Sequence, residues 1–102
     1  MVKLVILLRA GVERETEAYN DFLMLLEALP GLRRKAVSDV YGAMGGPAPY
    51  TTIIEATFDS RQAMEAALLS ESGVAAGQAL LGLAGPDAVT LYAHTLEENY
   101  EE

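Results

Sequence analysis

Cysteine is absent from this chain of 102 residues, and histidine occurs only once. Without thiols the chain can form no disulfide framework, no thiolate nucleophile and no cysteine-ligated zinc or iron–sulfur site. A single imidazole also excludes a histidine-rich metal site. The sequence therefore predicts no metal centre.

Positive charge is scarce as well. Seven Lys and Arg residues stand against fifteen Asp and Glu residues, which gives a formal net charge of −8. Such a charge repels phosphate backbones and anionic lipid surfaces at long range. We therefore expect neither a nucleic-acid partner nor a membrane partner. Arg61 is the only Lys or Arg that follows Lys35.

Long hydrophobic runs are missing. The apolar run Leu4 to Leu8 stops at Arg9 and is followed by no small-residue cleavage site, so it does not resemble a signal peptide. The apolar stretch from residue 74 to residue 89 is interrupted by Gln78 and by Pro86-Asp87, which disfavours a membrane helix. We predict a soluble, cytoplasmic protein.

Motifs that mark phosphate, metal and cofactor sites are also absent. The glycines of GAMGG at residues 42–46 match neither the dinucleotide-binding nor the P-loop fingerprint, and there is no HExxH sequence. The single histidine has no recognisable Ser or Asp partner for a catalytic triad. The sequence therefore predicts no cofactor, and these glycines are interpreted as a hairpin loop.

Half of the residues, 51%, are apolar, and their spacing predicts ordered structure. We expect strands over residues 2–8, 32–41, 50–58 and 88–96, and helices over residues 15–29, 60–69 and 74–81. Asp59 is the expected N-cap of the second helix, because Gln62 three residues later completes a capping box. Pro30-Gly31 ends the first helix and Ser70 to Gly73 ends the second.

This order predicts one α+β domain over residues 1–96, followed by an acidic tail over residues 97–102. Two strand-helix-strand halves in succession give the β-α-β-β-α-β pattern of a ferredoxin-like sandwich. Right-handed crossovers place both main helices on one face of an antiparallel four-stranded sheet.

The other face of that sheet is predicted to be apolar too. In the first strand, Leu4, Ile6 and Leu8 alternate with Val5 and Leu7, so both sets are hydrophobic. A chain of this length has no third layer to cover the second set. We therefore expect an obligate homodimer, packed sheet face to sheet face into a dimeric α+β barrel. We also expect Tyr92→Glu to abolish both the dimer and the fold.

Several segments resemble the EthD family of dimeric α+β barrel proteins. They are MVKLVILLR at residues 1–9, ALPGLRR at 28–34, PYTTIIEATFDS at 49–60, QAMEAALLSESGVAAG at 62–77 and VTLYAHTL at 89–96. The resemblance implies two ferredoxin-like subunits joined through their sheets. It also implies a pocket between sheet and helices for an aromatic or polyketide-like small molecule, and a loose connection with ether degradation and oxidoreduction.

One position departs from the family pattern. Many members carry a histidine in the first helix and a proline two residues later, where this chain has Phe22 and Met24. Because a phenyl ring cannot transfer a proton, the family's acid/base residue is absent. Whether the chain is an enzyme is therefore left open at this point.

Three side chains are candidates for replacing that acid/base group. His94 is the only group whose reference pKa lies near neutrality. Asp39 and Glu55 lie within predicted strands, and either carboxylate would become a candidate base if it pointed inward and lost its hydration. The alternative reading of all three is structural: hydrogen-bonded, solvated or ion-paired side chains.

Aromatic side chains are candidates for lining a ligand site. They are Tyr19, Phe22, Tyr41 and Tyr92. Tyrosines offer an apolar body with a polar tip, although such residues also pack at strand ends and interfaces. Three functions follow as hypotheses: a homodimer that binds a small apolar or aromatic compound, a cofactor-independent monooxygenase, cyclase or isomerase, and a structural or regulatory module without a cavity of about 300 Å³ or more.

Overall fold

The computed structural model of the chain describes residues 1–99. Its elements, in chain order, are β1 (Val2–Arg9), α1 (Glu17–Glu27), β2 (Arg34–Asp39), β3 (Tyr50–Phe58), α2 (Arg61–Leu69), α3 (Glu71–Leu83), the 3-10 turn η1 (Gly85–Asp87) and β4 (Ala88–His94). The predicted tail over residues 97–102 lies partly outside the described residues, and residues 95–99 have no regular secondary structure.

Side-chain caps explain where two helices begin. Thr16 caps α1, because its hydroxyl accepts a hydrogen bond from the backbone N–H of Tyr19 at 3.2 Å. Ser60 caps α2 in the same way, accepting from the N–H of Ala63 at 3.1 Å. The expectation that Asp59 caps this helix is therefore wrong by one residue, and the Asp59 carboxylate pairs with Arg33 at 3.0 Å instead.

A single residue separates α2 from α3. Ser70 accepts a hydrogen bond from the N–H of Gly73 at 3.1 Å and donates one to the carbonyl oxygen of Ala67 at 2.5 Å. Ser70 therefore ends one helix and begins the next, and the two helices meet at 74°. The sequence prediction of a break from Ser70 to Gly73 is too long, because this cap lets α3 begin at Glu71.

The sheet has the strand order β2-β3-β1-β4, and all neighbouring strands are antiparallel. The central strands β1 and β3 align Leu4 with Ala56 and Ile6 with Ile54. On the other side of β1, Leu4 lies opposite Tyr92 and Ile6 opposite Thr90. This confirms the predicted ferredoxin-like α+β fold with a four-stranded antiparallel sheet.

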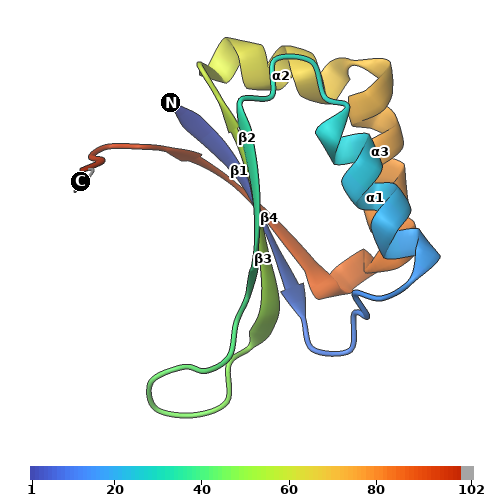
Figure 1. Cartoon of the computed structure of the whole chain (residues 1–102), viewed down its shortest axis with the longest axis vertical. Coiled ribbons are helices and arrows are strands. Elements are labelled where there is room, and N and C mark those ends of the chain that lie inside the picture. Colours follow the sequence, from blue (N-terminus) through green and yellow to red (C-terminus); the bar gives the residue numbers. More distant parts are fainter. Residues whose placement is uncertain (100–102) are drawn as a thin grey trace.

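All helices lie on one side of the sheet, and no helix or strand among residues 1–99 covers the other side (Figure 1). No single helix among residues 1–99 is long and apolar enough to cross a membrane. Taken together, α2 and α3 have the length and apolar composition of a membrane-crossing segment, but they are bent by 74° where they meet.

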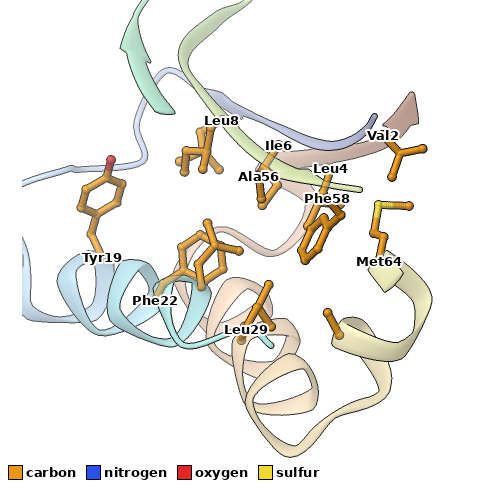
Figure 2. Close-up of a cluster of buried hydrophobic side chains, with 14 residues drawn as sticks. Val2, Leu4, Ile6, Leu8, Tyr19, Phe22, Leu29, Ala56, Phe58 and Met64 are labelled. Atoms are coloured by element: carbon orange, nitrogen blue, oxygen red, sulfur yellow. The ribbon is translucent and has the colours of Figure 1, made fainter. Parts of the chain in front are cut away.

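The core fills the space between the helices and the sheet (Figure 2). Its largest fully buried side chains are Phe22, Phe58, Ile6, Leu8, Leu26 and Ile54. Phe22 projects from α1 toward the strands, at the helical spacing the sequence predicts for this buried stripe. The even-numbered residues of β1 face this core, whereas Val5 and Leu7 face the uncovered side and are half-buried.

One core position is polar without a partner. Thr52 is 0% exposed, and its hydroxyl makes no hydrogen bond within the described part of the chain. Burying an unpaired hydroxyl costs free energy, and valine has the same shape. We expect Thr52→Val to raise the free energy of unfolding by about 1 kcal/mol in urea denaturation.

Thr51 provides the matched control for this substitution. Its hydroxyl lies 3.5 Å from the carbonyl oxygens of both Leu8 and Arg9. Thr51→Val therefore removes weak interactions and should not stabilise the protein. Equal stabilisation by both variants would point to the higher strand propensity of valine and would contradict the role assigned to the Thr52 hydroxyl.

Candidate functional site: a two-chamber cleft between sheet and helices

A cleft opens between β4 and the helices. Its deeper part, which we call the inner chamber, has a volume of about 340 Å³. The inner chamber is lined by Leu4, Ile6, Phe22, Leu26, Leu29, Leu68, Gly73, Ala76, Gly77, Leu80, Leu81, Gly85, Ala88, Thr90 and Tyr92. Only Thr90 and Tyr92 contribute polar side-chain atoms, so the chamber suits an apolar compound.

Small residues on α3 account for the space. The helix presents Gly73, Ala76 and Gly77 to the inner chamber, where larger side chains would fill the volume between α3 and the sheet. A Cβ atom at Gly77 would meet no heavy atom within 4 Å. The opposite wall is formed by β4, which is an edge strand of the sheet. Within residues 1–99, Thr90 and Tyr92 therefore have a neighbouring strand, β1, on one side only.

A second hollow, the outer chamber, adjoins the first and has a volume of about 480 Å³. It lies between α2 and the end of β4 and is lined by Arg61, Met64, Glu65, Leu68, Leu69, Tyr92, Ala93 and His94. Leu68 and Tyr92 line both chambers, so the two hollows adjoin at these side chains. Its charged groups are Arg61 and Glu65, whose side chains are 3.5 Å apart and both exposed.

Three of the residues singled out from the sequence lie at this cleft. Phe22 is 1% exposed and forms part of the inner wall, whereas Tyr92 is 66% exposed and stands where the chambers meet. His94 lines the outer chamber. In the register of β1 and β4, His94 lies opposite Val2, on the helix side of the sheet.

Tyr92 therefore points away from the uncovered sheet face. It lies opposite Leu4, a core residue, and lines the cleft. The sequence-based expectation that Tyr92→Glu abolishes the dimer assumes that Tyr92 lies on the uncovered face. That assignment is wrong, because Tyr92 lies on the helix side of the sheet. Leu91, its neighbour in the strand, occupies that face and is 48% exposed.

The two carboxylate candidates lie elsewhere. Glu55 is opposite Val5 on the uncovered sheet face and faces Lys3 at 4.0 Å. Asp39 ends β2 and forms an ion pair of 2.6 Å with Arg14. Neither carboxylate points into the cleft, so the inward orientation that would favour a catalytic base is not met at either position.

The remaining aromatic candidates are also outside the cleft lining. Tyr19 is buried in the core at 5% exposure, and burial raises the pKa of its hydroxyl above the usual value, with the Arg14 charge lowering it in part. Tyr41 is 99% exposed on the loop between β2 and β3, beside a shallow hollow formed by residues 39–44. The structure thus groups Phe22, Tyr92 and His94 and separates them from Tyr19 and Tyr41.

Sequence reasoning did not identify Arg61, Thr90 or the small residues of α3 as site residues. The spacing of Gly73, Ala76 and Gly77 at i, i+3 and i+4 is a signal that could have found the gap, since three small residues share one helix face. The sequence shows Arg61 as an isolated cation, but that it lines the same hollow as His94 depends on the tertiary fold. Within residues 1–99 no three carboxylate or imidazole side chains converge in a way that could hold a metal ion.

Comparison with known proteins places the fold. No protein-family model matches the chain, and no curated protein sequence matches it either. Among solved structures, an EthD family protein (ethyl tert-butyl ether D) from Bacillus halodurans superposes with a TM-score of 0.86 at 22% identity, over 94% of this chain and 99% of that one.

Two further structures extend the comparison. A dimeric ferredoxin-like protein of unknown function from a Jannaschia species has a TM-score of 0.73 at 15% identity, over 92% of this chain and 98% of that one. SnoaB, a cofactor-independent oxygenase from Streptomyces nogalater, has a TM-score of 0.69 at 14% identity, over 98% of this chain and 96% of that one. The chain therefore has the ferredoxin-like fold of an EthD family protein, as its sequence segments predicted.

Proposed function

We propose that this chain is an EthD-like protein that binds a small apolar or aromatic compound in the cleft, and that it works as a cytoplasmic homodimer. The inner chamber carries the proposal. A hollow of about 340 Å³ with mostly apolar walls falls within the usual range of small-molecule sites. The hypothesis of a purely structural module requires the absence of a hollow of about 300 Å³ or more, and the inner chamber exceeds that volume.

The uncovered sheet face supports the homodimer. The register places Val5 and Leu7 of β1 on this face beside Ile53 of β3 and Leu91 of β4. Complete burial of such a side chain contributes roughly 1.5 to 3 kcal/mol, so a second copy that covered them all would add stabilisation comparable to that of a small domain. Three structural neighbours are described as dimeric.

The charges on this face also favour a second copy. In the regularly paired part of the sheet, the uncovered face carries Lys3, Glu55 and Arg34 as its charged side chains. Two cations and one carboxylate give a face that is not acidic, although the whole chain has a net charge of −8. Two such faces can approach without stacking carboxylates on carboxylates.

Catalysis by His94 is the second candidate function. The imidazole lines the outer chamber, within the same cleft as the proposed ligand. It can exchange a proton with a bound compound, as a cofactor-independent reaction requires. SnoaB, which shares the fold, is described as a cofactor-independent oxygenase. Asp39 and Glu55 stand outside the cleft and do not support this role.

Filling the inner chamber tests the binding function. Gly77 lines the chamber and has open space around its Cβ position, so we expect Gly77→Leu to fold normally and to occupy part of the volume. The probe is N-phenyl-1-naphthylamine, an uncharged aromatic dye whose fluorescence rises in apolar surroundings. We expect the variant to bind it about tenfold more weakly than the original chain, because displaced volume removes apolar contacts.

Gly82 supplies the matched control. It lies in the same helix, also has open space around its Cβ position, and does not line either chamber. Gly82→Leu should therefore leave dye binding unchanged while raising helix propensity in the same way. Failure of the original chain to bind the dye, or equal weakening by both substitutions, would reject the inner chamber as the binding site.

A further inference from the structure

We infer that the natural ligand is an amphipathic anion, with its apolar body in the inner chamber and its negative group held in the outer chamber by Arg61. This inference rests on the proposed binding function and specifies the class of compound. A small aromatic or aliphatic carboxylate has this form. The inference follows from the composition of the two chambers, the state of the Arg61 ion pair and the distribution of charge along the chain.

The two adjoining chambers differ in polarity. The inner chamber contains no charged side chain, whereas the outer chamber contains the charged Arg61 and Glu65 as well as the imidazole of His94. A compound that spans both, past Tyr92 and Leu68, would meet apolar walls at one end and hydrogen-bond donors at the other. A guanidinium group donates to a carboxylate through two parallel N–H groups, and the imidazole of His94 can donate a further hydrogen bond.

Arg61 is free to exchange its present partner. Its contact with Glu65 is an i,i+4 pair at 3.5 Å, and the two side chains are 70% and 59% exposed. Exposed pairs of this kind contribute little to stability, so an incoming anion can displace Glu65 without a large cost. Glu65 therefore competes with an anionic ligand for Arg61, and removing its charge should strengthen binding of that ligand.

Arg61 lies at the N-terminus of α2, where a positive charge is unfavourable for the helix. Arg61 is the first residue of α2, and the first turn of this helix contains no acidic residue, whereas α1 and α3 begin with Glu17 and Glu71. A cation at a helix N-terminus is disfavoured by the helix dipole. The only cation in the last two thirds of the sequence thus stands at the cleft, in a place that helix stability does not favour.

The experiment compares two dyes of nearly the same shape. One is the anion 8-anilinonaphthalene-1-sulfonate, and the other is the uncharged N-phenyl-1-naphthylamine, which lacks the sulfonate. We expect Arg61→Gln to weaken binding of the anionic dye about tenfold and to leave binding of the uncharged dye within about twofold. Glu65→Gln should strengthen binding of the anionic dye by roughly twofold or more, because the competing carboxylate is gone.

Arg14→Gln is the matched control for net charge. Arg14 pairs with Asp39 and lines neither chamber, so its loss changes the charge of the chain equally without touching the cleft. We expect it to leave the affinity for both dyes unchanged. Competition with 4-phenylbutyrate and with 4-phenylbutan-1-ol then compares a carboxylate with an alcohol of the same skeleton, and the acid should compete better only when Arg61 is present.

The outcomes separate the two proposals. If the uncharged dye binds the original chain and Arg61→Gln does not selectively weaken the anionic dye, the anion inference is overturned and the binding function stands. If Arg61→Gln weakens both dyes alike, Arg61 supports the shape of the cleft and the anion inference is again overturned. If the original chain binds neither dye, the proposed binding function fails together with the inference.

Discussion

Gly73→Ala is expected to destabilise the protein by about 3 kcal/mol, the upper end of the usual cost of overpacking. A Cβ atom at this position would lie 2.2 Å from the carbonyl oxygen of Ala67 and 2.5 Å from that of Leu68. Both obstacles are backbone atoms of α2, so no side chain can rotate away. The junction between α2 and α3 would have to open, and with it the hydrogen bond from the Gly73 N–H to Ser70.

The measurement is thermal unfolding followed by far-ultraviolet circular dichroism. A loss of this size should lower the Tm by more than about 10 °C in a domain of this length. Gly77→Ala, in the same helix but with open space around the Cβ position, should instead raise stability by about 1 kcal/mol through helix propensity. A Gly73→Ala variant as stable as the original chain would contradict the close approach of the two helices.

Leu91→Glu is expected to convert the proposed homodimer into monomers. Leu91 lies on the uncovered sheet face, opposite Val5, and is 48% exposed in the single chain. A carboxylate placed there would lose its hydration against an apolar partner surface, which costs several kcal/mol without a paired charge. The same side chain stays hydrated in an isolated subunit. Sedimentation velocity should therefore show a folded monomer.

Tyr92→Glu is the control for this substitution, one residue further along the same strand. Its side chain points to the helix side of the sheet and is 66% exposed, so the variant should remain folded and dimeric. Dimer loss in Tyr92→Glu but not in Leu91→Glu would mean that the subunits associate through the opposite face. A monomer already in the original chain at high concentration would remove the homodimer from the proposed function.

The architecture could be predicted from the sequence because apolar periodicity reports which side chains face the core. The stripe containing Tyr19, Phe22 and Leu26 marks α1, and the alternation in β1 predicts both of its faces. Cap positions were harder, since Asp59 and Ser60 are adjacent and both are good N-caps. Ser60 is the cap, whereas the Asp59 carboxylate pairs with Arg33, and no local pattern contains that tertiary pairing.

The residues of the cleft are brought together by contacts between segments that are far apart in the sequence. Tyr92 was recognised as a candidate, but its side of the sheet follows from its pairing with Leu4 across β1 and β4. Glu55 and Asp39 look like candidate bases in the sequence, and only the fold shows that their partners are Lys3 and Arg14. Arg61 and His94 lie more than thirty residues apart and line the same hollow only because the fold places the end of β4 across the outer chamber from α2.

Ser70 joins the two helices that line the cleft. Helix α2 lines the outer chamber, and α3 lines the inner chamber. Since one hydroxyl both closes α2 and opens α3, an inserted residue would break at least one of these bonds and turn α3 about its axis. Each added residue rotates a helix by about 100°, which would carry Gly73 and Ala76 away from the cleft. We therefore expect the shape of the cleft to tolerate substitutions in α3 but not insertions at Ser70.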